Sequence, residues 1–154
     1  MSLKKKIAYG ILGLLVIIQF FRIDKDNPTV NPDMDFVVLS SASEDMRDLL
    51  KTSCYDCHSN ETIYPWYSNV APISWWVKDH VNDARGHLNF SVWGEYNEKR
   101  KDHKLEEIID EVNEHEMPLK SYLIVHTESK LDDTKREELT NWIQSLRTSS
   151  GIVE

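Results

Sequence analysis

The pentapeptide Cys54-Tyr55-Asp56-Cys57-His58 contains the only two cysteines of this chain of 154 residues. A Cys-x-x-Cys-His sequence is the attachment signature of a c-type haem. Two thiols three positions apart on a helical turn reach two vinyl groups on one edge of the haem, and the adjacent histidine binds the iron. The motif therefore predicts one covalent haem c, attached through Cys54 and Cys57, with His58 as the proximal ligand. The fold has to place this helical turn against a pocket for the porphyrin.

Three other interpretations use the same two cysteines. A structural zinc site normally has four cysteine or histidine ligands, and the chain has no second Cys-x-x-Cys and no His-x-x-x-His pair to complete one. A thioredoxin-like redox pair follows a strand in a βαβ pattern, which this sequence does not show. A disulfide between Cys54 and Cys57 would close a loop too small to add much stability. The spacing favours haem attachment.

Met117-Pro118 provides the candidate for the second axial ligand, 59 residues after His58. In class I cytochromes c the distal methionine lies in a comparable loop, often beside a proline. A thioether raises the reduction potential relative to a second imidazole. His115 and His126 compete with Met117 for this position, an open or water-bound position is a further alternative, and most methionines are simply core residues. Weaker candidates are His80, His87 and His103.

Aromatic residues follow the attachment motif closely, among them Tyr64, Trp66 and Tyr67. Aromatic rings exclude water from a haem, and Tyr O–H and Trp N–H groups hydrogen-bond its propionates. We therefore expect these three side chains to contribute to cofactor binding, while an ordinary place in the domain core is the alternative. Trp75 and Trp76 are adjacent, so on one helix they face different ways, and one of them is a candidate to cover the edge of the pocket.

Hydrophobic periodicity predicts an all-α domain, because no alternating run long enough for a sheet is present. The expected helices cover residues 43–53, 72–86, 101–113 and 133–147. Ser43 is the expected N-cap of the first helix, which leads directly into Cys54, and Pro72 takes the first position of the second. Thr134 and Glu137 are expected to form a capping box in the last. The apolar stripes expected to face the core are Met46, Leu49 and Leu50, then Leu105, Ile108, Ile109 and Val112, then Leu139, Trp142, Ile143 and Leu146.

An apolar run from Ile7 to Phe21 follows three lysines at positions 4–6. It is shorter than the roughly 20 residues of a full membrane span, but flanking apolar residues and snorkelling basic side chains extend its reach. We expect a single-pass transmembrane anchor rather than a cleaved signal peptide, because no small-x-small cleavage site follows the run. The lysines favour a cytoplasmic N-terminus. The remainder would then lie in the periplasm of a bacterium, on the side of the inner membrane where thioethers form.

The expected organisation has four parts. They are an anchor helix at residues 1–23, a tether at 24–39, a haem-binding domain at 40–148 and a tail at 149–154. The tether contains Pro28 and Pro32 among asparagines and aspartates, a composition typical of linkers. Folded structure is expected to begin near Phe36.

The charge of the chain is strongly acidic after the apolar run. That part contains all 26 acidic residues and 15 basic ones, which gives it a formal charge of −11. Nucleic acid is excluded as a partner by such a surface. An acidic face can steer a basic redox partner protein toward the domain, and a merely solvated surface is the alternative.

Several motifs in order resemble a known family. They are CYDCHSNET-x-YPWY, APISWWVKDHV, LNFSVW, EMPLKSYL-x-x-H and LTNW, over about residues 40–148. They resemble the small haem-binding domain of membrane-anchored bacterial c-type cytochromes, notably of Bacteroidetes type. The resemblance implies a cytochrome c-like domain with haem c on Cys54 and Cys57, and His58 and Met117 as axial ligands. Ala84 and Leu119 replace a glycine and a proline that are frequent in the family, and neither change touches the ligands.

The sequence thus predicts a membrane-tethered, periplasmic mono-haem c-type cytochrome that transfers single electrons and is not an enzyme. A second hypothesis is a haem enzyme or sensor, peroxidase-like or gas-binding, with an open sixth position and His115 or His126 as the distal acid–base residue. A third is a zinc-binding interaction module. These hypotheses differ in what occupies the position opposite His58.

Overall fold

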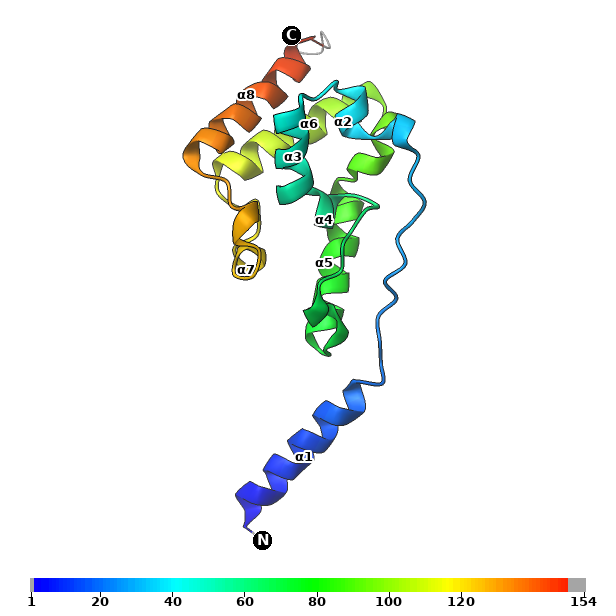
Figure 1. Cartoon of the computed structure of the whole chain (residues 1–154), viewed down its shortest axis with the longest axis vertical. Helices are drawn as coiled ribbons and strands as arrows, with labels where there is room; N and C mark the ends of the chain where they lie inside the picture. Colours follow the sequence, from blue (N-terminus) through cyan, green and yellow to red (C-terminus); the bar gives the residue numbers. More distant parts are fainter. Residues whose placement is uncertain (1, 150–154) are drawn as a thin grey trace.

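The computed structural model describes residues 2–149, and no strand occurs among them. The all-α prediction is confirmed for this part of the chain (Figure 1). The α-helices are α1 (Leu3–Ile18), α2 (Phe36–Leu39), α3 (Glu44–Ser53), α4 (Tyr55–His58), α5 (Ile73–His87), α6 (Glu98–Asn113), α7 (Lys120–Leu123) and α8 (Asp133–Ser149). Short 3-10 helices are η1 (Pro32–Met34), η2 (Trp66–Asn69), η3 (Phe90–Glu95) and η4 (Thr127–Ser129). Most of the expected tail, residues 150–154, lies outside the described residues.

The helices begin where polar side chains cap them. Ser43 Oγ accepts a hydrogen bond from Met46 N at 3.3 Å, so the predicted cap of α3 is confirmed. The helix expected at 101–113 begins three residues earlier, because Asn97 Oδ1 accepts from Arg100 N at 2.9 Å. An N-cap side chain satisfies an N–H group that has no partner within the helix.

The capping box predicted for α8 is wrong. Asp132 Oδ1 accepts a hydrogen bond from Lys135 N at 2.9 Å, so the cap is Asp132 rather than Thr134. Thr134 lies inside the helix, which begins at Asp133. An aspartate caps at least as well as a threonine, and Asp132 stands directly before the expected helix start at 133.

The core lies where η3, α6 and α8 meet α2 and α3. Phe36 is fully buried, with its ring 5.1 Å from that of Phe90 and 4.7 Å from that of Trp93. Leu139 and Ile143 of α8 are also fully buried, and α8 packs beside α6 (Figure 1). Each such side chain contributes about 1.5–3 kcal/mol through removal from water. The predicted stripes of α3, α6 and α8 all pack in or against this core.

The tether ends earlier than residue 39. Phe36 and Val37, assigned to it from the sequence, belong to the core cluster. The N-terminal part of the tether lies against the domain. The Asn27 side chain donates to Thr62 O at 2.8 Å and accepts from Arg85 at 2.7 Å, and Thr29 O accepts from Asn60 at 3.2 Å.

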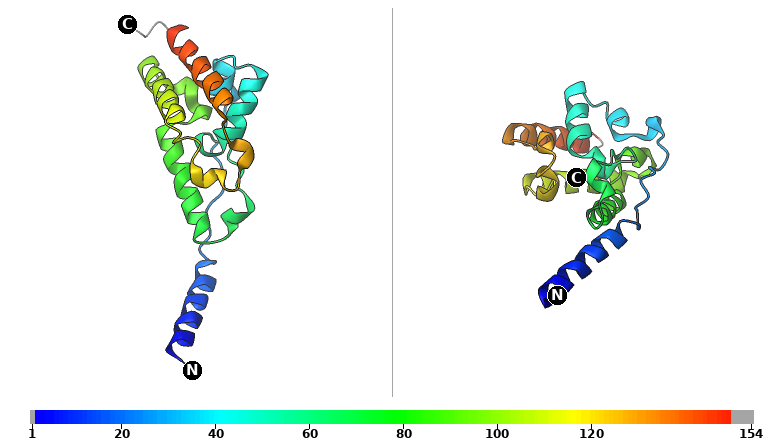
Figure 2. Two further views of the ribbon diagram at one scale, coloured as in Figure 1. Left: turned by 90° about the vertical axis from the view of Figure 1, so that its left-hand side faces the viewer. Right: turned by 60° about the horizontal axis from the view of Figure 1, so that its bottom comes forward.

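Helix α1 projects away from the other helices in all views (Figures 1 and 2), and its residues are exposed almost throughout. It is connected to the domain by hydrogen bonds at its C-terminal end, where the Gln19 amide exchanges two bonds with the Ala71 backbone at 2.9 and 3.0 Å. Within residues 2–149, no helix has the length and apolar character needed to cross a membrane. The structure therefore gives no support to the predicted transmembrane anchor helix.

Candidate functional site

The attachment motif lies at the junction of α3 and α4. Helix α3 ends at Ser53, and Cys54 leaves the helical conformation with φ −127° and ψ −40°. Helix α4 then carries Cys57 and His58. Both cysteines are free thiols, so the disulfide alternative is wrong for this structure.

A cavity of about 400 Å³, which we call the first cavity, opens beside Cys54. Its volume is that of a small-molecule site, and such sites are mostly apolar. His58 and Met117 both line it. The apolar part of its wall comes from α3, α5, η3, α6 and the segment after α6, and includes Leu50, Ala84, Phe90, Ile108, Val112 and Leu119.

A second cavity of about 340 Å³ opens beside Cys57. Its wall comes from η2, α5 and α7 with their flanking residues, and it includes Trp66, Tyr67 and Trp76. His80 and Leu119 line both cavities, which are therefore adjacent parts of one cleft. The two cysteines thus face neighbouring parts of a single, largely apolar cleft.

The His58 ring is oriented as a metal ligand requires. Its Nδ1 lies 3.2 Å from Leu88 O at the end of α5. A proton on Nδ1 donated to this carbonyl leaves Nε2 unprotonated and able to bind a metal. Burial lowers the pKa of His58, against the opposing effect of the Leu88 and Ala84 carbonyls. The imidazole is therefore neutral, which is the form that binds iron.

Burial also keeps both thiols protonated. It raises the pKa of Cys54 to about 12, with a further contribution from Cys57. It raises the pKa of Cys57 to about 11, where Asp56 adds to the effect and Arg85 opposes it. A thioether carries no charge, so an apolar wall that disfavours thiolates accommodates the attached form well.

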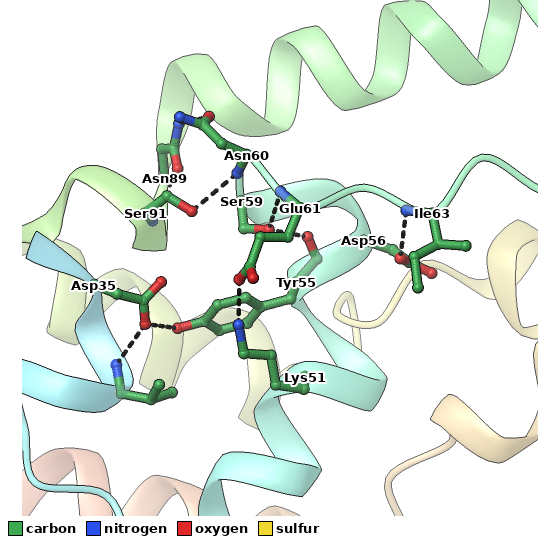
Figure 3. Close-up of polar contacts among 11 residues, drawn as sticks. Asp35, Lys51, Tyr55, Asp56, Ser59, Asn60, Glu61, Ile63, Asn89 and Ser91 are labelled. Atoms are coloured by element: carbon green, nitrogen blue, oxygen red, sulfur yellow. Dashed lines mark hydrogen bonds and ion pairs between the residues drawn. The ribbon is translucent and has the colours of Figure 1, made fainter. Parts of the chain in front are cut away.

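Tyr55 fixes α4 to the core. Its hydroxyl donates to Asp35 Oδ1 at 2.7 Å (Figure 3), and its ring stacks on Phe90 with centroids 5.0 Å apart. The Ser59 hydroxyl then donates to Tyr55 O at 2.7 Å. Because Tyr55 lies inside the attachment motif, these contacts hold the helical turn that carries both cysteines.

The residues after His58 are held to the start of η3. Asn60 N donates to Ser91 Oγ at 3.0 Å (Figure 3), and Asn89 Nδ2 donates to Asn60 Oδ1 at 2.8 Å. All three residues are buried, so each bond satisfies a polar group removed from water. Hydrogen bonds therefore hold the motif in place both at Tyr55 and in the loop that follows His58.

Arg85 of α5 joins this loop to the tether. Its Nε donates to Ser59 O at 2.7 Å, and its Nη2 donates to Thr62 Oγ1 and to Asn27 Oδ1, both at 2.7 Å. Thr62 Oγ1 in turn donates to Asp56 O at 2.7 Å. The guanidinium fork thus connects three segments that are far apart in the sequence.

Met117 is held in place by α6 and α8. After α6 the chain turns through His115, whose φ is 60°, and the Met117 amide donates to Glu111 O at 3.1 Å. Arg136 Nη1 of α8 donates to the carbonyl oxygens of Met117, at 3.3 Å, and Val112. These bonds fix the backbone of Met117 at the edge of the first cavity.

The histidine competitors are distributed differently from the sequence expectation. His115 and His126 line neither cavity, whereas His80 and His87 line the first. His126 is engaged by Tyr67, with its Nε2 2.8 Å from the hydroxyl, and by Glu128 Oε1, 3.2 Å from Nδ1. The ligand assignment itself stays a prediction.

The aromatic residues separate into two groups. Trp66 and Tyr67 line the second cavity, as does Trp76. Tyr64 lines neither cavity and instead accepts a hydrogen bond from Lys78 Nζ at 3.3 Å. Trp75 points elsewhere, since its indole N–H donates to Phe21 O at 2.8 Å.

Sequence reasoning missed Asp56, Tyr122 and Arg85. The Asp56 carboxylate accepts from Ile63 N at 3.2 Å (Figure 3) and from the Tyr122 hydroxyl at 2.8 Å. Burial raises the pKa of Tyr122, and Asp56 adds to this effect. The only available signal was the carboxylate between the two cysteines, because the partners of Asp56 and Arg85 are set by tertiary contacts.

A zinc module finds no support in the donor geometry. No group of three or more His, Cys, Asp or Glu residues able to hold a metal ion occurs in residues 2–149. The donor set at α4 consists of two neutral thiols and one neutral imidazole beside an apolar cleft. These groups fit a covalently attached haem.

An all-helical domain that presents Cys-x-x-Cys-His to an apolar cleft defines a haem protein. The sequence model of the haem-binding domain family matches residues 13–145. The chain therefore belongs to the haem-binding domain family, and haem is its cofactor. No curated protein and no solved structure matches the chain.

Proposed function

We propose that this protein is a membrane-tethered mono-haem c-type cytochrome that transfers single electrons and is not an enzyme. The observation that carries the proposal is that His58 and Met117 line the same cavity, at whose wall Cys54 lies. An imidazole and a thioether are the axial pair of electron-transfer cytochromes c.

Each residue of the motif has a separate role in the proposal. Cys54 and Cys57 would retain one haem c through thioether bonds, and His58 Nε2 would bind the iron while Leu88 O holds Nδ1 of the same ring. Met117 would supply the second iron ligand from the wall of the same cavity. When bound, the haem supplies an iron centre that changes between the ferric and ferrous states by one electron.

The wall of the cleft would influence the reduction potential of the iron. Apolar side chains such as Leu50, Phe90 and Val112 exclude water, and a medium of low polarity disfavours the additional positive charge of ferric iron. The thioether of Met117 acts in the same direction. Trp66 and Tyr67 extend the apolar wall into the second cavity, and Tyr64 lines neither cavity.

Membrane tethering and a periplasmic domain complete the proposal. They are supported by the apolar run from Ile7 to Phe21, by lysines 4–6, and by the exposure of α1. Helical hydrogen bonding continues past Ile18 to Phe21 N, which adds to the apolar length. The formal charge of −11 after the run suits a basic redox partner protein.

A haem enzyme or sensor is the second candidate, and His80 is the observation that favours it. His80 lines both cavities, and its Nδ1 is 2.9 Å from Trp76 O, which leaves Nε2 available. With an open sixth position, His80 would serve as the acid–base residue in place of His115 or His126.

Spectroscopy of the purified haem-loaded protein distinguishes the candidates. An electron carrier gives a methionine–iron charge-transfer band when oxidised and binds carbon monoxide slowly when reduced. Met117→Ala should abolish the band and make binding fast, and His80→Ala should change neither. If the ferrous wild-type protein binds carbon monoxide readily and Met117→Ala alters nothing, the enzyme or sensor hypothesis replaces the electron carrier.

A further inference from the structure

The segment between α6 and α8 carries Met117, and its middle part, residues 120–128, contains no buried residue, whereas Pro118 and Leu131 nearer its ends are buried. It spans residues 114–132 and includes α7, which has no buried residue. Its exposed apolar residues include Ile124 and Val125, which are 78% and 58% exposed. A segment with few buried apolar contacts is among the first to open locally. Side-chain hydrogen bonds therefore contribute much of the attachment of residues 120–128 to α4 and η2.

One of these hydrogen bonds leads directly to the attachment motif. The Tyr122 hydroxyl donates to Asp56 Oδ2 at 2.8 Å, across 66 residues of sequence. Asp56 lies between Cys54 and Cys57 on α4, and its other carboxylate oxygen is held by Ile63 N at 3.2 Å. One oxygen of the Asp56 carboxylate is thus held by the loop after α4, and the other accepts the hydrogen bond from the segment that carries Met117.

A second contact supports the same docking. The His126 ring stacks on Tyr122 with centroids 4.2 Å apart and planes 11° apart. Its Nε2 lies 2.8 Å from the Tyr67 hydroxyl of η2. The two tyrosine hydroxyls therefore join the segment to α4 and to η2, next to the cavity that Cys57 borders.

We propose that Asp56 and Tyr122 are positioning residues that hold the Met117 segment against α4 and so determine how firmly Met117 stays in the sixth position. This inference rests on the proposed ligation by Met117. The thioethers fix one side of the cleft through Cys54 and Cys57. The backbone of Met117 is held by α6 and α8, and the Asp56–Tyr122 bond holds the part of the segment that follows Met117 against α4.

The decisive variant is Tyr122→Phe, which removes one hydroxyl and keeps the ring that stacks on His126. In the ferrous haem-loaded protein, carbon monoxide binds only when Met117 has left the iron. Loss of one hydrogen bond to a charged group favours the open form by about tenfold, so the rate of carbon monoxide binding should rise by about that factor. The methionine–iron band should weaken accordingly.

Two further variants make the test specific. Tyr96→Phe is the matched control, because the Tyr96 hydroxyl accepts a hydrogen bond from Asn89 N at 3.0 Å within the core, in η3 and its flanks. It should lower thermal stability without changing the carbon monoxide rate. Asp56→Ala removes the same bond and also the bond from Ile63 N, so it should bind carbon monoxide at least as fast as Tyr122→Phe, and the double variant should be no faster than Asp56→Ala.

The outcomes separate this inference from the proposed function. If Met117→Ala opens the site and Tyr122→Phe binds carbon monoxide as slowly as the wild type, the positioning role is refuted and Met117 ligation stands. If Tyr96→Phe accelerates binding as much as Tyr122→Phe, the effect is general destabilisation and the inference fails. If Met117→Ala changes nothing, the proposed function fails first.

Discussion

Replacement of Tyr55 by phenylalanine removes a single hydroxyl from within the attachment motif. Tyr55 and Asp35 are 2% and 4% exposed, and the hydroxyl donates to Asp35 Oδ1 at 2.7 Å. Within the described residues, Asp35 Oδ2 has no hydrogen-bond partner. The variant would leave this buried carboxylate with the hydrogen bond from Val37 N.

The loss should be large for one hydroxyl. A hydrogen bond to a charged group contributes about 1.5–3 kcal/mol, and a buried charge deprived of a partner lies toward the upper part of that range. The phenylalanine ring keeps the stacking on Phe90, so little packing energy changes. We expect the free energy of unfolding to fall by about 2 kcal/mol and the Tm by about 6–10 °C.

Urea denaturation of the haem-loaded protein, followed by far-ultraviolet circular dichroism, measures this loss. Tyr96→Phe is the control, because its hydroxyl accepts from a neutral backbone amide, Asn89 N, at 3.0 Å. That bond contributes about 1 kcal/mol. The reasoning is refuted if Tyr55→Phe is destabilised no more than Tyr96→Phe.

The pH dependence gives a second measurement on the same pair of proteins. Burial, with the Asp35 hydrogen bond, raises the pKa of Tyr55 above the usual value of about 10. A raised tyrosine pKa stabilises the fold at pH values below about 10, and this contribution is lost as the pH rises further. The stability difference between wild type and Tyr55→Phe should therefore shrink from about pH 8 to about pH 11. A constant difference would contradict this cause.

Further predictions concern attachment, packing and the tether. Cys54→Ser combined with Cys57→Ser should abolish the haem stain that survives denaturing electrophoresis, because coordination alone does not persist there; a retained stain would overturn covalent attachment. Leu139→Ala should lower the free energy of unfolding by about 2–5 kcal/mol in urea titrations, since Leu139 is fully buried, and a loss below about 1 kcal/mol would contradict its core position. Asn27→Ala removes the bonds to Thr62 O and Arg85, so residues 20–34 should be cleaved about fivefold faster in limited proteolysis; unchanged cleavage would mean that the tether is held by other contacts. A reporter active only in the periplasm should work when fused to the C-terminus, and activity of a cytoplasmic reporter there would reverse the proposed topology.

Local patterns were sufficient for the longer domain helices α3, α5, α6 and α8, whereas the short helices α2, α4 and α7 were not predicted. The stripes of α3, α6 and α8 repeat with the helical period, and that period depends only on neighbouring residues. Helix starts were less certain, because several polar residues compete for each cap. Asp132 precedes Thr134, and Asn97 precedes the expected start at 101, and each competitor caps its helix. Neither Asp132 nor Asn97 was predicted as a cap from the sequence.

The sequence by itself indicated a haem cofactor, because two cysteines and a histidine stand at the spacing of a haem attachment motif, and the family match supports haem. It also singled out Met117, which the fold brings to the cavity that His58 lines. Only the tertiary structure decided which histidines face the cleft, and that Asp56 meets Tyr122 across 66 residues. Such contacts depend on how helices pack over long separations, and no local period encodes them.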